Sequence, residues 1–76
     1  MYSYRQYCYV NGKLEWMISS YKSFDTKVQA INDARETAQK YLPRFSHGKY
    51  EEKEDGAETW FSTPNHDRIH MKYVVI

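Results

Sequence analysis

Apolar and polar residues alternate along most of the first twenty-one positions, MYSYRQYCYVNGKLEWMISSY. Successive side chains of a β-strand point to opposite faces, so this period of two predicts strands. Asn11-Gly12 interrupts the pattern, and this dipeptide favours a two-residue hairpin turn with positive φ at both positions. We therefore predict an antiparallel hairpin in which Val10 faces Lys13 and Tyr9 faces Leu14.

Unbroken pairing from this turn sorts the hairpin into two faces. It places Tyr7 opposite Trp16 and Cys8 opposite Glu15. The more apolar face is the predicted core and carries Tyr7, Tyr9, Leu14, Trp16 and Ile18. The other face is predicted to stay outside the core and carries Tyr2, Tyr4, Gln6, Cys8, Glu15, Met17 and Tyr21.

The next segment has the spacing of an amphipathic helix from about Thr26 to Leu42. Its predicted apolar stripe consists of Val28, Ile31, Ala34, Ala38 and Leu42. Ala30 aligns with Ala34 and Ala38, and such small side chains would let the helix lie close to a sheet. Thr26 and Gln29 have the spacing of a capping box, with Asp25 as another capping candidate. Pro43 ends the helix, because the residue before a proline avoids the α region.

The second half of the chain contains a second hairpin and a final strand. Asp55-Gly56 is taken as the turn, which pairs Lys53 with Glu58, Glu52 with Thr59 and Tyr50 with Phe61. Residues 62–67 are dense in turn formers and predict a loop. Residues 68–76 alternate with a period of two and are rich in β-branched residues, which predicts a strand in a central position.

These elements predict one small α+β domain over residues 1–76. Their order is β-β-α-β-β-β, and one helix packed on a mainly antiparallel sheet is the natural two-layer solution. A β-grasp-like arrangement has the same order and length and is the alternative. There is no residue-level similarity to ubiquitin, and the sequence ends in Val-Val-Ile rather than Gly-Gly, so conjugation is not supported.

Composition indicates how large the core of such a domain can be and in which cellular compartment it would occur. A chain of 76 residues buries only about 60% of its unfolded surface, so its core is small. Cys8 is the single cysteine, which fits a reducing compartment and predicts a cytoplasmic protein. The sequence shows no signal peptide and no run of about 18 apolar residues, so no membrane association is expected.

The charges are unevenly distributed along the chain. Residues 1–49 carry eight Lys/Arg against four Asp/Glu, whereas residues 50–76 carry three against six. The acidic excess is concentrated around the second predicted turn. Such asymmetry either orients the molecule toward a charged partner or only keeps a hairpin hydrated.

Candidate catalytic and metal-binding residues are few. His66 and His70 have a metal-ligand spacing only if they lie on a helix, and in a strand they would be about 13 Å apart. His47, Asp67 and Cys8 add no recognised ligand pattern. Cys8 as a nucleophile would need an activating base, and a facing Glu15 would raise its pKa instead. We therefore expect neither a cofactor nor a metal, and no enzymatic activity.

The sequence favours a small interaction module that binds a protein and inhibits or regulates it. The predicted contacts are an exposed aromatic sheet face and an acidic hairpin, comprising Tyr2, Tyr4, Met17, Tyr21, Glu51, Glu52, Glu54, Asp55 and Glu58. A second copy of the chain, forming a homodimer, is the simplest partner. The alternative function is binding of single-stranded nucleic acid through Tyr2, Tyr4 and Tyr21, with Lys13 and Lys22 on phosphates. The partner's identity and the biological process are not encoded in these patterns.

Overall fold

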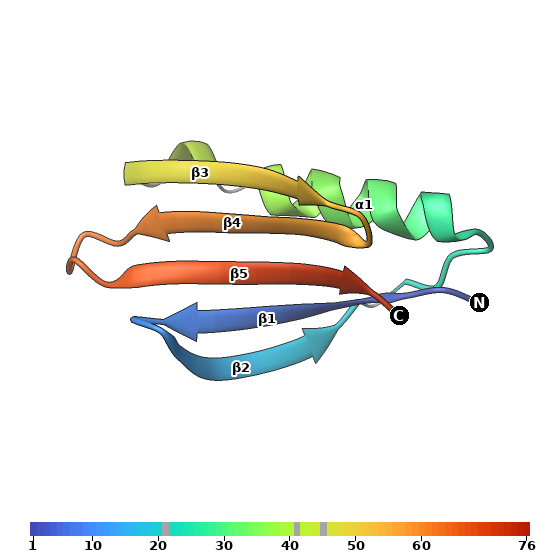
Figure 1. Cartoon of the computed structure of the whole chain (residues 1–76), viewed down its shortest axis with the longest axis horizontal. Helices are drawn as coiled ribbons and strands as arrows, with labels where there is room; N and C mark the ends of the chain where they lie inside the picture. Colours follow the sequence, from blue (N-terminus) through green and yellow to red (C-terminus); the bar gives the residue numbers. More distant parts are fainter. Residues whose placement is uncertain (21, 41, 45) are drawn as a thin grey trace.

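The computed structural model describes residues 1–20, 22–40, 42–44 and 46–76, and of Ser46 only the backbone. Within these residues one α-helix packs on a five-stranded antiparallel sheet (Figure 1). The elements are β1 (Tyr4–Val10), β2 (Lys13–Ser19), α1 (Lys27–Lys40), a 3-10 turn (Leu42–Arg44), β3 (Ser46–Lys53), β4 (Gly56–Ser62) and β5 (Arg68–Val75). The predicted α+β class and element order are confirmed.

The strands lie in the order β2-β1-β5-β4-β3, so the C-terminal strand is central, as predicted. β1 and β5 pair in antiparallel orientation. The β-grasp-like alternative is therefore wrong, because that arrangement requires its first and last strands to run parallel.

A stripe of alanines brings α1 close to the sheet. Ala30, Ala34 and Ala38 are 0%, 0% and 3% exposed and pack in one core with Ala57 and Tyr73. The predicted close approach of the helix is thus correct. The predicted stripe is wrong at its first residue, since Val28 lies about 200° around the helix from Ala30 and stays exposed.

The single helix covers only part of one sheet face. α1 packs mainly on β4 and β5, and in Figure 1 it lies behind the β3–β4 side of the sheet. Five strands about 4.8 Å apart span about 19 Å, whereas a helix with its side chains is only about 10 Å wide. β2, at the far edge of the helix-side face, is therefore left without a covering element among the described residues, whereas α1 still reaches β1 at Tyr4.

The helix begins with the predicted capping box. The Gln29 backbone N–H donates to Thr26 Oγ1 at 3.2 Å, and the Thr26 N–H donates to Gln29 Oε1 at 3.3 Å. Helical geometry ends at Lys40, and Pro43 falls within the 3-10 turn that follows. Leu42, the predicted last residue of the helix, lies in this 3-10 turn instead, and residue 41 lies outside the described residues.

The first hairpin has the predicted turn but not the predicted register throughout. Asn11 and Gly12 have φ of 51° and 87°, and the Val10–Lys13 and Tyr9–Leu14 pairs are confirmed. The register then shifts by one residue at Glu15, so that Cys8 pairs with Trp16 and later pairs follow the new register. This β-bulge is not encoded in the turn dipeptide, and it makes the predicted pairs beyond Leu14 wrong.

The predicted burial of the two β1 faces is also wrong. Tyr4 and Cys8 are 4% and 5% exposed, whereas Tyr7 and Tyr9 are only half-buried. The register with β5 explains this outcome, because Tyr4 pairs with Val75 and Cys8 with Met71 on the helix side. Tyr7 and Tyr9 instead pair with Lys72 and His70, on the face opposite the helix.

The turn of the second hairpin lies one residue earlier than predicted, which shifts the pairing register by two residues. Lys53 pairs with Gly56 and Glu51 with Glu58, which places Glu54 and Asp55 in the turn. A displacement of two residues makes the predicted pairs wrong but leaves every side chain on its predicted face. The one-residue shift in the first hairpin does not preserve the faces.

Gly56 sits where no side chain can be accommodated. Its φ is 156°, and an added Cβ would collide with the carbonyl of Tyr73 on the neighbouring strand. Gly56→Ala should therefore lower the free energy of unfolding by about 2 kcal/mol or more, measured by urea titration. Gly12→Ala is the matched control: its φ is 87° but its Cβ would meet open space, so about 1 kcal/mol is expected. Equal losses would show that Gly56 is not sterically constrained.

Tyr4 links the sheet to the helix through its hydroxyl group. This O–H donates to Asp33 Oδ2 at 2.8 Å and lies 3.1 Å from Thr37 Oγ1, and burial raises the pKa of the phenol. Tyr4→Phe should lower the free energy of unfolding by about 1–2 kcal/mol, because it removes hydrogen bonds without creating a large cavity. Tyr2→Phe, at a 39% exposed ring, should change it by less than about 0.5 kcal/mol. The opposite ranking in urea titrations would contradict this anchoring role.

Candidate binding surfaces

β2 forms one edge of the sheet and is exposed along its whole length. All seven of its residues are exposed. Four are large and apolar: Leu14, Trp16, Met17 and Ile18 are 48%, 42%, 46% and 42% exposed. We call these four residues the apolar edge. Clustered apolar side chains on an unpaired strand are a typical interaction feature.

The apolar edge presents side chains on both faces of the sheet. Trp16 and Ile18 pair with Cys8 and Gln6 and so lie on the helix side, whereas Met17 pairs with Tyr7 on the opposite side. On the helix side, a groove runs between the end of α1 and the uncovered strands. Its apolar lining includes Trp16, Ala38, Leu42, Phe61 and Met71.

The opposite edge of the sheet, β3, has a different character. Between Lys49 and Lys53 it carries charged side chains at four of five positions. It also contains an irregularity between Ser46 and Lys49, where His47 has a φ of 58°. Charges and bulges are the usual means of preventing an edge from recruiting another strand. β2 has a bulge but presents mainly apolar side chains beyond it.

The sheet face opposite α1, which we call the open face, carries a row of rings. Cross-strand pairing aligns Lys49, Trp60, His70, Tyr9 and Leu14 from β3 across to β2. The rings of Trp60 and His70 stack with centroids 4.7 Å apart, and those of His70 and Tyr9 with centroids 5.6 Å apart. Such separations are typical of offset stacking, and all three rings remain partly exposed.

Ammonium groups lie against two of these rings. Lys49 Nζ is 5.2 Å from the Trp60 ring centroid, and Lys72 Nζ is 5.4 Å from that of Tyr9. Both distances are within the range of cation–π attraction. The open face therefore combines partly exposed rings with adjacent positive charge.

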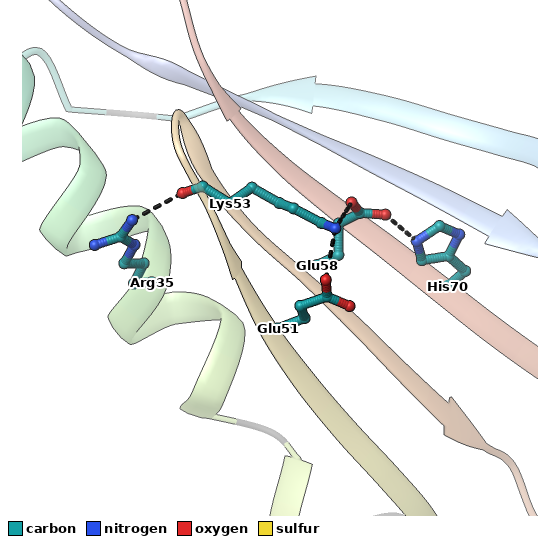
Figure 2. Close-up of polar contacts among 5 residues, drawn as sticks. All are labelled: Arg35, Glu51, Lys53, Glu58 and His70. Carbon is teal, nitrogen blue, oxygen red and sulfur yellow. Dashed lines mark hydrogen bonds and ion pairs between the residues drawn. The ribbon is translucent and has the colours of Figure 1, made fainter.

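A polar network holds the centre of this face in place (Figure 2). His70 Nε2 lies 2.6 Å from Glu58 Oε1, while Lys53 Nζ lies 3.5 Å from Glu58 Oε2 and 2.8 Å from Glu51 Oε1. The hydrogen bond between Lys53 and Glu51 raises the pKa of the ammonium and lowers that of the carboxyl. Across the hairpin, Arg35 Nη2 donates to the Lys53 carbonyl at 2.8 Å, which ties this end to α1.

The open face is more positive than the rest of the chain. Strand pairing places five Lys/Arg and two Glu on this face, which gives it a net charge of +3. The rest of the chain carries the other six Lys/Arg and eight Asp/Glu, a net charge of −2. The cations are Arg5, Lys49, Lys53, Arg68 and Lys72. The two carboxylates, Glu51 and Glu58, are the ones paired within the network.

The predicted aromatic contacts are only partly accessible. Tyr4 was predicted to lie on an exposed face, and that is wrong because it is buried under α1. Tyr2 and Met17 are exposed, although Met17 lies on the other face from Tyr4. Tyr21 lies outside the described residues. Whether any of these residues contacts a partner stays a prediction.

The predicted acidic hairpin is largely neutralised within the fold. Asp55 lies 3.1 Å from Lys27, Glu52 lies 4.0 Å from Arg35, and the network above engages Glu51 and Glu58. Glu54 has no ion pair among the residues that the structure describes. These carboxylates also point to different sides of the hairpin, so they do not form one anionic patch.

The candidate metal-binding residues do not come together in the structure. Over the described ranges, no three His, Cys, Asp or Glu side chains gather in a way that could hold a metal ion. His66 lies in the β4–β5 loop, and His70 lies on the open face beside Glu58. No helix in the described part of the chain is long and apolar enough to span a bilayer.

Sequence reasoning missed the central members of the open face, namely Lys49, Trp60, His70 and Lys72. The alternation in residues 68–76 did separate His70 and Lys72 from the core side. Their alignment with Tyr9 and Trp60 depends on which strands are neighbours, and no local pattern specifies that order.

No protein-family model, curated protein or solved structure matches this chain. The binding surfaces are therefore interpreted from their geometry and chemistry alone.

Burial controls the reactivity of Cys8. Desolvation raises the pKa of its thiol, and Glu15 raises it further, in the direction expected from the sequence. The folded protein should therefore react with a disulfide reagent at neutral pH much more slowly than the same protein in urea, because both thiolate and access are limited.

The reaction is followed by the absorbance of the released thiolate between pH 7 and 10. A Cys8→Ser/Ser23→Cys variant is the control, because it places a thiol on an exposed loop residue and should react rapidly when folded. Equal rates for the two folded proteins would contradict the protected state of Cys8.

Proposed function

We propose that this chain is a protein-binding module that accepts an extended segment of its partner along β2. The observation that supports it is the apolar edge, a fully exposed edge strand with four large apolar side chains at least 42% exposed. An edge strand offers unpaired backbone N–H and C=O groups, and addition of a partner strand satisfies them. Neighbouring apolar side chains then supply burial and specificity.

The distribution of the apolar side chains favours an added strand over a docked helix. A helix would lie on one face of the sheet and cover either Trp16 and Ile18 or Met17, but not all three. The side chains of an added strand alternate between both faces, so one segment contacts both sets. The partner segment is expected to be extended and apolar on both faces.

The bulge at Glu15 favours a foreign segment over a second copy of β2. Antiparallel self-pairing centred on Met17 would place Trp16 opposite Ile18 of the other copy. It would also bring two bulges into one short ladder, and bulges twist an edge away from further pairing. A regular partner strand introduces no second bulge.

In this proposal the chain acts by binding a segment of its partner and not by catalysing a reaction. Its single thiol is buried, and His70 is engaged by Glu58. Inhibition or regulation would follow if the bound segment belongs to a working part of the partner. The neutralised acidic hairpin is not needed for this mode of binding.

The test uses a peptide-display library selected on the immobilised chain. Enriched peptides should carry apolar residues at successive positions, so that both faces of the added strand are apolar. Their affinity should fall at least tenfold in Met17→Lys and in Ile18→Lys, one variant for each face, since buried unpaired charges are costly. Val28→Lys is the matched control, because Val28 is 65% exposed on α1, away from β2. Fluorescence anisotropy of labelled peptides gives the affinities.

Two outcomes would overturn the proposal. Peptides that bind all three variants equally would place the docking surface elsewhere. A dimer in sedimentation velocity that Met17→Lys and Ile18→Lys abolish would assign the apolar edge to a second copy of this chain. Urea titrations of each variant verify that the fold is retained.

A further inference from the structure

We propose that the open face is a second binding site whose ligand is single-stranded nucleic acid. It adjoins the apolar edge, whose Leu14 and Met17 lie on the same face. It is centred, however, on the three stacked rings of Trp60, His70 and Tyr9 and differs from that edge in chemistry. The open face has half-buried rings at its centre and cations around them, whereas the apolar edge presents aliphatic and aromatic side chains without a cation-rich surround.

Two rings of the open face are each paired with an ammonium group. Trp60 and Tyr9 each have a lysine Nζ within 5.4 Å of the ring centroid, and His70 lies between the two rings. A single strand presents bases and phosphates in alternation, so it needs rings for bases and nearby cations for phosphates. This face supplies both, because Lys49 lies in the same cross-strand row as the rings and Lys72 lies in the adjacent row.

The open face also carries a net positive charge. Its balance of +3 against −2 for the rest of the chain favours an anionic ligand on this side. Glu51 and Glu58 are already engaged by Lys53 and His70, so Lys49, Lys72 and Arg68 remain to meet phosphates. The overall charge of +1 conceals this segregation.

The shape of the open face suits a single strand. The open face is a twisted sheet without a helix on it, as Figure 1 shows, and no described element projects from it to enter a duplex groove. Bases can reach the rings only when they are unstacked, which selects single strands. A protein interface is less favoured, because lysine is depleted from interface centres.

The polar network gives the site a fixed central ring. Glu58 Oε1 lies 2.6 Å from His70 Nε2, while Lys53 Nζ contacts Glu58 Oε2 from the other side at 3.5 Å. The imidazole is thereby held between Trp60 and Tyr9. A ring row fixed in advance loses little side-chain freedom on binding.

Fluorescence anisotropy with labelled 20-nucleotide single strands of DNA and of RNA tests the proposal. Affinity should fall as salt is raised from 50 to 200 mM, and a duplex of the same sequence should bind at least tenfold more weakly. Lys49→Gln/Lys72→Gln should weaken binding at least tenfold and reduce the slope of log K against log salt by about two. Lys13→Gln/Lys22→Gln removes the same charge away from the open face and should change affinity less than threefold.

A second readout reports on ring stacking directly. In a Trp16→Phe background, Trp60 is the remaining tryptophan, and its fluorescence should be quenched when a strand binds. Trp60→Leu in the wild-type background should weaken binding about tenfold while the fold, verified by circular dichroism, is retained.

Several results would overturn the inference. One is the absence of salt-dependent binding to either the DNA or the RNA strand, and another is an equal loss of affinity in the two double-lysine variants. The others are an affinity for the duplex equal to that for the single strand, and binding that does not quench the fluorescence of Trp60. Equal competition by an acidic polypeptide such as poly-glutamate would show a general polyanion surface instead. None of these results bears on peptide binding at β2 as judged by Ile18→Lys, because Ile18 lies on the helix side of the sheet.

Discussion

The width of a single helix is the constraint on which the rest of this structure depends. α1 reaches the sheet through three alanines and is held there by the Tyr4 hydroxyl on Asp33 and Thr37. This close contact seals a small core over β4 and β5. A helix about 10 Å wide does not cover five strands, so the remaining sheet surface must face water or a ligand.

The two candidate surfaces follow from that constraint in different ways. β2 lies farthest from the helix on the β1 side, so Trp16 and Ile18 stay exposed although they face the helix layer. The open face is exposed because the described part of the chain has no second helix to place on it. The rings on this face stack on one another and on a lysine side chain, and these contacts leave the rings half-buried although no described helix covers them.

Elements determined by neighbouring residues were predictable. The Asn11-Gly12 turn, the capping box at Thr26 and Gln29, and the alternation in β5 each depend on contacts within a few residues. Features that depend on residues distant in the sequence were not predictable. The bulge at Glu15 and the burial of Tyr4 both reflect how β1 sits between β2 and β5. The displaced second turn reflects the close approach of Gly56 to Tyr73.

The sequence by itself determined the α+β class and the element order, because periodicity and turn chemistry act locally, and the β-branched content of the last strand favoured its central position. Only the tertiary structure decided which side of β1 is buried and which residues form a binding surface. The reason is geometric: a strand pattern with aromatic residues on both faces has two nearly equivalent orientations. The neighbouring strand β5, with Val75 and Met71 on one side and His70 and Lys72 on the other, selects between them.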